Sequence, residues 1–435
     1  MSRLKVFLIV CILFLNLVLR FHNYTAYPQR GATSDEYTYA FLGVSLLTKH
    51  IPISWSSFPE YKHRYNLTIK NIYFPIVYPY FDHPPLNGLL VGSWALLFGQ
   101  NTFEKIDLKT IRMIPIFLGI ISSFLVFLIA QRVYSYKIGV WSLLIYSTVT
   151  VFIMNTRVVV AENLLTVFML LSLFLFITFQ KKMTFKKSAL LGILCGLALW
   201  TKVLGISVFF ILLFLFIKEK TKKKHILTFS ISFFAFVLVL LGYAYYYDWH
   251  LFWVIQAFQS GRNIGPETLR LLTQDPVIVN KVFYDGWYFF GFFSLFFTFL
   301  DYKKNKFLII PFFIYFSFLL LSMTKEGHSG WYMIPLFPFM SISAAYLLTD
   351  FIKRESFLFL VFSLFIGLSE IRLLYEEPFG INSPRFRILF LFIIAPYLIA
   401  KLFNKKVLAS WISQFFFYLF ILGNIFVTFY YIHPA

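Results

Sequence analysis

Apolar runs of about twenty residues recur along almost the whole chain, and they constrain its fold more than any other feature. Each run is long enough to cross a lipid bilayer as a helix. The 435 residues are 59% hydrophobic and only 13% charged, which leaves too little polar surface to cover a water-soluble globule of this size. We therefore expect an all-α polytopic membrane protein, and we exclude a disordered chain, a coiled coil and a cytosolic enzyme.

The hydropathy pattern predicts about thirteen transmembrane helices. They lie near residues 4–22, 111–131, 138–155, 160–180, 187–201, 203–217, 225–247, 282–300, 307–323, 331–349, 357–374, 387–402 and 408–432. No small-residue cleavage site follows the first run, so it reads as a retained anchor rather than a removed signal peptide. Cys11 and Cys195 lie inside apolar runs and indicate no disulfide or metal framework.

The basic residues fix the expected orientation. The net charge of +20 does not indicate a nucleic-acid partner, because the lysines gather in short loops between the runs, as the positive-inside rule expects. The four main clusters lie at residues 181–187, 218–224, 303–306 and 401–406. With the N-terminus inside, the inner segments hold 21 Lys and Arg with 4 acidic residues, and the outer side holds 18 with 15. Candidate chemistry is therefore expected at the outer face.

One apolar segment, Leu86–Phe98, is too short to cross. If it did cross, every later lysine cluster would move to the outside. We therefore interpret it as a helix that lies in or dips into the outer interface. The longest outer loop then covers about residues 23–110, and it is followed by outer loops near 248–281 and 324–330.

Two acidic motifs lie in the long outer loop. Asp35 and Glu36 follow Ser34 and precede an apolar helical pattern, so Ser34 is expected to cap a short helix with both carboxylates in its first turn. Asp82 and His83 precede two prolines, which open the Leu86–Phe98 helix. Capping alone would account for either motif, since acidic residues are favoured in a first turn.

Three further charges lie at the predicted outer ends of spans. Glu162 stands at the head of the fourth span, where a carboxylate is costly unless it faces protein, water or a cation. Arg157 precedes it, and an ion pair between the two would be a purely structural alternative. Lys202 interrupts an apolar stretch, so it marks an outer hairpin tip or points into a cavity, unless its side chain simply reaches the interface.

The last outer group contains Lys325, His328, Trp331 and Tyr332. Its members would individually suit a solvated loop or an interfacial aromatic belt. What favours function is that all of these unusual charges fall on the same predicted side of the membrane, which unrelated structural causes would not produce.

Taken in their order along the chain, the motifs described above resemble those of the GT-C class of integral-membrane glycosyltransferases. The resemblance covers about residues 5–345. The resemblance is strongest to the protein O-mannosyltransferase group, which includes the bacterial lipid A aminoarabinose transferases. His83 stands where many members have Lys. The resemblance implies a catalytic membrane module over residues 1–350, which includes the outer loop 23–110, while residues 351–435 add helices to the same membrane domain.

The resemblance also implies inverting transfer of a sugar from a polyprenyl-phosphate carrier to a lipid, glycan or protein acceptor, at the outer face of what would be a bacterial inner membrane. Asp35 is the expected base, because an attacking hydroxyl must lose its proton. Glu36 would orient the loop or share the site, and Glu162 would position the acceptor or a metal.

The substrate contacts follow from the same chemistry. Cations suit the phosphate leaving group, and Arg157, Lys202 and Lys325 are the candidates. His83, His328 and Tyr332 complete the expected substrate contacts. Asp82 with His83 offers ligands for a divalent metal ion, the one cofactor considered.

Two other function classes remain open at this stage. A transporter or lipid flippase would show internal repeats and charges near the bilayer midplane, and the sequence has neither. A polymerase or ligase of surface polysaccharide would share the lipid-linked chemistry of the outer face.

Overall fold

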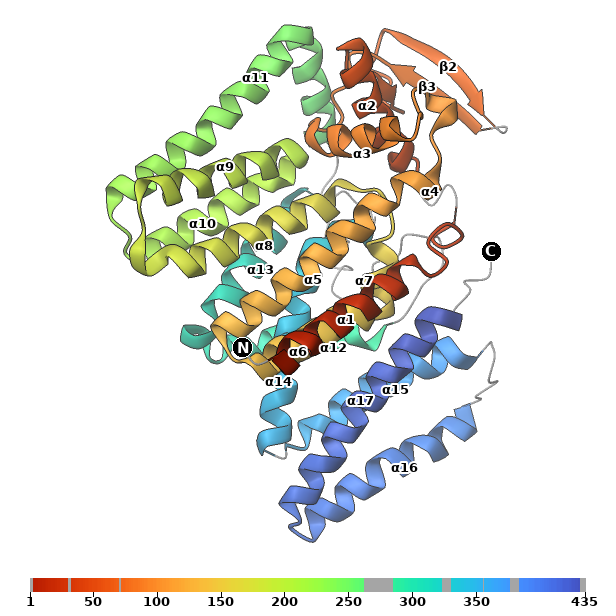
Figure 1. Cartoon of the computed structure of the whole chain (residues 1–435), viewed down its shortest axis with the longest axis vertical. Helices are drawn as coiled ribbons and strands as arrows, with labels where there is room; N and C mark the ends of the chain where they lie inside the picture. The colour runs from red at the N-terminus through yellow and green to blue at the C-terminus, as the bar shows by residue number, and fades with distance from the viewer. Residues whose placement is uncertain are drawn as a thin grey trace.

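The computed structural model describes residues 3–29, 33–69, 72–261, 285–322, 330–354, 356–375 and 383–430, and most of these residues are helical (Figure 1). The helices of the membrane region are α1 (Arg3–Phe21), α5 (Met113–Val133), α6 (Tyr136–Thr148), α7 (Thr150–Asn155), α8 (Ala161–Phe179), α9 (Phe185–Thr201), α10 (Ile206–Lys218), α11 (Lys223–Ser260), α12 (Gly286–Phe299), α13 (Tyr302–Ser322), α14 (Phe337–Arg354), α15 (Leu358–Tyr375), α16 (Ser383–Leu402) and α17 (Lys406–Tyr430).

Seven helical segments among the described residues are long and apolar enough to cross a membrane, and three shorter apolar helices accompany them. The chain is therefore an integral membrane protein, as predicted. The exact number of thirteen spans stays a prediction. Figure 1 shows the hairpin turns α5–α6, α8–α9, α10–α11 and α16–α17 along the left and lower edge, opposite the outer lobe at the top right. Three of these turns, α8–α9, α10–α11 and α16–α17, carry lysine clusters, so the arrangement agrees with the expected orientation.

The structure adds detail to three of the predicted spans. The span expected at 138–155 divides at Val149, whose extended backbone (φ −62°, ψ 120°) separates α6 from α7. The spans expected at 187–201 and 203–217 form a hairpin, α9 and α10, joined by the short helix η3 (Val203–Gly205). A Cβ atom at Gly205 would lie 2.0 Å from the carbonyl oxygen of Ala198. Only glycine fits this close turn, which brings Lys202 to the tip of the hairpin.

The long outer loop folds into a lobe of two helices and a small sheet. The helices are α2 (Asp35–Lys49) and α3 (Leu86–Leu97), and the strands are β1 (Ser54–Trp55), β2 (Arg64–Ile69) and β3 (Ile72–Val77). The strands form an antiparallel sheet in the order β1-β3-β2, with Arg64 opposite Val77. The interfacial helices were predicted, but the sheet was not, because strands of two to six residues give little periodic signal.

Glycines set the distance between α2 and α3. A Cβ atom at Gly43 would lie 1.8 Å from the carbonyl oxygen of Gly88, and one at Gly92 would lie 2.4 Å from the backbone of Gly43. Gly88 and Gly92 are four residues apart, so they lie on one face of α3, where small residues let two helix backbones approach. This crossing holds α2, and with it Asp35 and Glu36, against the lobe.

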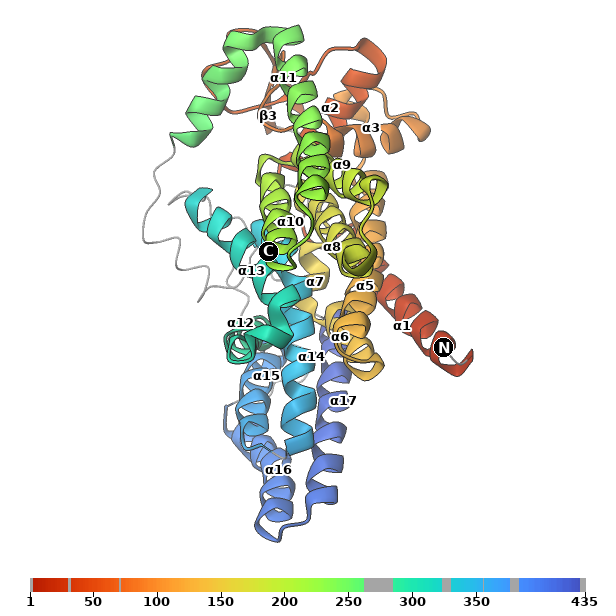
Figure 2. The ribbon, with the colours of Figure 1, turned by 90° about the vertical axis from the view of Figure 1, so that its left-hand side faces the viewer.

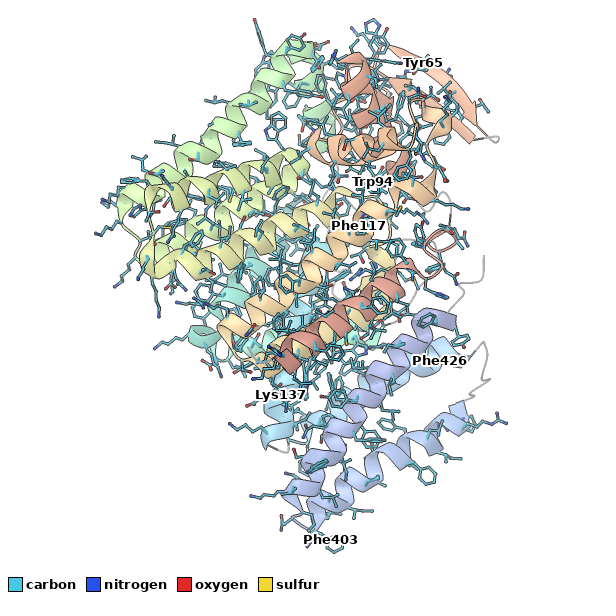
Figure 3. The ribbon with its side chains drawn as sticks, in the orientation of Figure 1. Tyr65, Trp94, Phe117, Lys137, Phe403 and Phe426 are labelled. Carbon is cyan, nitrogen blue, oxygen red and sulfur yellow. The ribbon has the colours of Figure 1, made fainter. Side chains whose placement is uncertain are left out.

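The lobe is fixed to the membrane region on two sides. On one side, the indole nitrogen of Trp94 in α3 donates to the carbonyl oxygen of Thr110 (3.0 Å), and its ring lies 6.3 Å from that of Phe117 in α5 (Figure 3). Thr110 belongs to α4 (Leu108–Ile111), a short helix that leads into α5. The lobe therefore rests on the outer end of α5.

On the other side, α11 extends past the membrane region. Its 38 residues would span about 57 Å as a straight helix, well beyond the roughly 30 Å of hydrocarbon. The helix bends at Asp248, which has non-helical angles (φ −169°, ψ 97°) and whose carboxylate accepts from the backbone nitrogen of Leu251 (2.8 Å). Beyond the bend, α11 packs on the lobe (Figure 2), and Phe252 contacts Phe81 with ring centroids 5.5 Å apart.

Candidate functional site

Asp35 and Glu36 begin α2, as the sequence predicts, but the expected cap is wrong. Ser34 makes no capping hydrogen bond. Instead the hydroxyl oxygen of Thr33 accepts from the backbone nitrogen of Asp35 (3.1 Å). Asp35 is half-buried, whereas Glu36 is fully buried. The two neighbouring carboxylates therefore have different surroundings.

Glu36 is held by Arg112, a residue that the sequence analysis did not single out. The Arg112 guanidinium donates to both carboxylate oxygens of Glu36 at 2.8 and 2.7 Å, and both side chains are fully buried. The backbone nitrogen of Val159 also donates to Glu36 (3.1 Å). The other Arg112 donors reach the carbonyl oxygens of Tyr24 (2.9 Å) and Pro28 (2.6 Å). This geometry favours the orienting role for Glu36 over a direct part in chemistry.

Glu162 and Lys202 form a second buried ion pair. Glu162 lies in the first turn of α8, and its Oε1 accepts a hydrogen bond from Lys202 Nζ. Lys202 Nζ also lies 4.0 Å from the centroid of the Tyr332 ring. Tyr332 belongs to η5 (Gly330–Leu336), and its carbonyl oxygen accepts from the hydroxyl of Tyr315 in α13 (3.0 Å). The alternative Arg157–Glu162 pair is therefore not formed, and Lys202, only 8% exposed, does not extend to the interface.

Tyr39 connects α2 to this pair. Its phenol lies near the backbone of Ala161, the residue before Glu162. Burial raises the pKa of the Tyr39 phenol well above its ordinary value, and the nearby carboxylates of Glu162 and Asp35 raise it further. Asp35 therefore lies within electrostatic reach of the group that contains Glu162.

The charge state of Lys202 follows from these neighbours. Burial lowers the pKa of its ammonium group, but the carboxylate of Glu162, the phenol of Tyr332 and the carboxylate of Asp35 together outweigh burial, so the pKa is raised. Lys202 is therefore a permanently charged cation at the outer end of α9. Glu162, Lys202 and Tyr332, all singled out from the sequence, thus lie together, and Asp35 lies within electrostatic reach of Lys202.

Asp82 and His83 lie beside α2. Asp82 accepts a hydrogen bond from the hydroxyl of Tyr61 (2.6 Å). The ring of His83 stacks on that of Tyr39, with centroids 5.0 Å apart. From α11, Gln259 donates to the carbonyl oxygen of Asp82 (2.8 Å). The Asp-His motif is thus held between the lobe and the end of α11, next to the face of α2 that carries Tyr39.

The residues at this motif do not make a metal site by themselves. Within the described parts of the chain, no three His, Cys, Asp or Glu side chains come together in a way that could hold a metal ion. One oxygen of Asp82 is engaged by Tyr61, and the His83 ring is stacked on Tyr39. A divalent ion at Asp82 and His83 remains a prediction, and no step below depends on it.

Arg157 is close in sequence to this group but has other partners. Its guanidinium donates to the carbonyl oxygens of Leu19 (2.7 Å), Arg20 (3.2 Å) and Tyr27 (3.3 Å). The first two carbonyls end α1, where a helix has unsatisfied acceptors and the negative end of its dipole. This arrangement favours a structural role for Arg157 over the predicted phosphate contact. Lys325 and His328 lie outside the described residues.

An apolar groove lies on the surface of the helical region. It consists of two adjoining hollows of about 540 and 410 Å³ between α10, α12 and α13, which share Phe214, Phe313 and Ile314. Along α13 the lining runs from Tyr302 to Leu321, which is about 29 Å of helix. The groove therefore has the length of a bilayer's hydrocarbon layer, and α10 connects it through η3 to Lys202.

The comparisons with known proteins agree with the predicted resemblance. The family model described as "Dolichyl-phosphate-mannose-protein mannosyltransferase" matches residues 82–244, which include Glu162, Lys202 and the Asp-His motif. No curated protein matches the chain in sequence. The structure resembles that of ArnT from Cupriavidus metallidurans bound to undecaprenyl phosphate, with 14% identity, a TM-score of 0.57, and coverage of 98% of this chain and 76% of ArnT. The chain has the GT-C glycosyltransferase fold.

Two structures of the archaeal oligosaccharyltransferase AglB from Archaeoglobus fulgidus share the fold. The complex with an inhibitory peptide and a dolichol-phosphate has 13% identity and a TM-score of 0.52, over 94% of this chain and 56% of AglB. The complex with zinc and sulfate has 14% identity and a TM-score of 0.50, over 93% and 53%. This chain thus spans about half of AglB.

Proposed function

We propose that the protein is a glycosyltransferase that moves a sugar from a polyprenyl-phosphate carrier to an acceptor at the outer face of the membrane. The observation that carries this proposal is a charged group at the outer end of the helices: Lys202 contacts Glu162 and Tyr332, and Asp35 lies within electrostatic reach of it. An apolar groove lies along α10, the helix that follows Lys202 in the chain. A carboxylate base, a buried cation and a path for a lipid tail are the three requirements of such a reaction. The family match and the likeness to a structure holding undecaprenyl phosphate support it.

Asp35 is the proposed base. An acceptor hydroxyl attacks the anomeric carbon while the bond from that carbon to the phosphate oxygen breaks, and the hydroxyl proton passes to the Asp35 carboxylate. Attack from the face opposite the leaving group inverts the anomeric configuration. Asp35 suits this role better than Glu36, because both oxygens of Glu36 are occupied by Arg112.

Lys202 is the proposed partner of the leaving group. The departing polyprenyl phosphate keeps the electron pair of the broken bond, so its negative charge grows in the transition state and a fixed cation stabilises it. An ammonium group has three donors, and the described contacts of Lys202 use one of them on Glu162. The remaining donors suit a phosphate oxygen, and the pKa raised by the surrounding acids keeps the group charged.

The groove is the proposed seat of the isoprenoid tail. Its lining is almost wholly aromatic and aliphatic, and Phe214 and Phe296 are about half exposed, at 46% and 56%. A carrier lipid could thus enter sideways from the bilayer without leaving an apolar environment. A lipid-linked donor also suits a site beyond the hydrocarbon layer, because nucleotide sugars are made and kept in the cytoplasm. We place the protein in a bacterial inner membrane, with this site on the periplasmic side.

Replacement of Asp35 tests the proposal. Purified protein in lipid, given undecaprenyl-phosphate mannose and a cell-envelope extract as acceptor, should release undecaprenyl phosphate. Asp35→Asn keeps the shape and removes the base, so release should fall about 10²–10⁴-fold. Glu104→Gln, a change of an exposed carboxylate in the same lobe, should leave it unchanged.

Three outcomes would contradict parts of the proposal. Full activity of Asp35→Asn would place the base elsewhere. Efficient transfer from a soluble nucleotide sugar, with no lipid present, would overturn the donor class. Movement of a lipid-linked sugar across vesicles without any new glycosidic product would favour the transporter reading.

A further inference from the structure

One oxygen of the Glu162 carboxylate has no hydrogen-bond partner in the described parts of the chain. The residue is fully buried, and its Oε1 accepts from Lys202, but Oε2 is buried and unpaired. A buried carboxylate oxygen without a donor loses its hydration and gains nothing in return. Native structures avoid such a loss unless the group has a partner at some stage of function.

The surroundings of Glu162 are those of a ligand site. The Glu162 carboxylate lies within electrostatic reach of the phenols of Tyr39 in α2 and Tyr315 in α13. Lys202 lies between Glu162 and the ring of Tyr332. Tyrosines from three separate elements thus lie near the Glu162–Lys202 pair, and aromatic rings suit the apolar faces of a sugar ring.

A ligand that pairs with Oε2 of Glu162 must bring a hydrogen-bond donor, because an ionised carboxylate only accepts. A sugar carries such donors on its ring, whereas a polyprenyl phosphate without a sugar carries acceptors at neutral pH.

We propose that Oε2 of Glu162 accepts a hydrogen bond from a hydroxyl group on the ring of the donor sugar. The inference rests on the proposed function, because it takes the phosphate of the carrier to lie on Lys202. Lys202 contacts Glu162 directly. A phosphate bound to Lys202 therefore places the attached sugar next to Glu162. Glu162 is then a specificity residue for the sugar, whereas Lys202 recognises the carrier whether or not it bears a sugar.

Binding of two kinds of probe separates these roles. The probes are undecaprenyl phosphate and a set of undecaprenyl-phosphate sugars bearing mannose, glucose, galactose or N-acetylglucosamine. Binding to purified protein is measured by native mass spectrometry. The wild-type protein should bind at least one sugar-bearing carrier more tightly than the bare carrier. Glu162→Gln should weaken that binding about tenfold, because a charge-assisted hydrogen bond becomes a neutral one, and should leave the bare carrier within about twofold.

A matched control comes from another lysine–glutamate ion pair. Glu219 accepts from Lys306 in the same way as Glu162 does from Lys202, but it lies at the predicted inner end of α10 and is partly exposed. Glu219→Gln should change neither kind of binding. Lys202→Ala should weaken both the bare and the sugar-bearing carrier.

A measurement on the wild-type protein keeps the inference testable if Glu162→Gln does not fold. Monodeoxy versions of the preferred donor remove one ring hydroxyl at a time. One of them should bind about tenfold more weakly to the wild-type protein, and in Glu162→Gln the same deletion should cost less than about threefold. Equal binding of bare and sugar-bearing carriers, or no effect of Glu162→Gln, would overturn the inference alone. Failure of the wild-type protein to bind any carrier would instead overturn the proposed function.

Discussion

The guanidinium of Arg112 contacts both carboxylate oxygens of Glu36 at 2.8 and 2.7 Å, with neither side chain exposed. The same guanidinium holds backbone carbonyls of the segment that follows α1, at Tyr24 and Pro28. One ion pair therefore fixes the start of α2 relative to α1 and α5. Because Asp35 is the preceding residue, this pair sets the position of the proposed base without taking part in the reaction.

Glu36→Gln should therefore act on stability. Removal of one partner leaves the Arg112 charge buried and unpaired, which typically costs about 3–5 kcal/mol. We expect a clearly lower melting temperature of the purified protein in detergent, whereas Asp35→Asn should melt close to the wild-type protein. If Glu36→Gln kept full stability and lost only turnover, Glu36 would belong to the reacting groups instead.

The sequence predicted one half of this pair and not the other. Glu36 was conspicuous because it follows Asp35 at the start of a helical pattern. Arg112 lies 76 residues further on and was counted among the outer basic residues. Its position just inside the predicted span 111–131 is the one sign of its role, because a cation at that depth needs a partner. A single sequence does not say which carboxylate that partner is.

The same limit explains the other differences. Glu162 and Lys202 were each found as charges at the ends of apolar runs, but their pairing depends on how α8 packs against α9. Arg157 has the same sequence signal, yet it binds the end of α1. Local hydropathy therefore predicts which charges are unusual and on which side they lie, whereas tertiary packing decides which of them face the site.

Gly92→Ala should disturb the crossing of α2 and α3. An added Cβ atom would lie 2.4 Å from the backbone of Gly43, and backbone cannot move aside as a flexible side chain can. Overpacking of this kind costs about 1–3 kcal/mol, and it would shift Asp35 with the rest of α2. We expect reduced thermal stability and reduced turnover together. Gly242→Ala is the matched control, because a Cβ atom there meets nothing within 4 Å.

Gln259 should matter for turnover although it belongs to α11. Its amide donates to the carbonyl oxygen of Asp82 (2.8 Å), and the neighbouring Gln256 donates to that of Phe81 (3.2 Å). Gln259→Leu removes a donor that fixes the Asp-His motif, so kcat should fall several-fold while the melting temperature changes little.

The control for this position is Gln414→Leu in α17, which loses only a weak contact within its own helix (3.4 Å). Gln259→Glu has the same shape as glutamine but no N–H donor when ionised, so it should behave like Gln259→Leu. Normal turnover of both Gln259 variants would show that α11 does not position the motif.

The orientation of the chain can be measured with single cysteines, and the function depends on it. Lys49 ends α2 and Lys223 begins α11, and both side chains are exposed. In a chain with Cys11→Ser and Cys195→Ala, Lys49→Cys should react with an impermeant thiol reagent in intact cells. Lys223→Cys should react only after the cells are broken, because the basic loops are retained inside. The opposite result would place Asp35, Glu162 and Lys202 in the compartment where nucleotide sugars are available, and a lipid carrier would no longer be required to bring the sugar across.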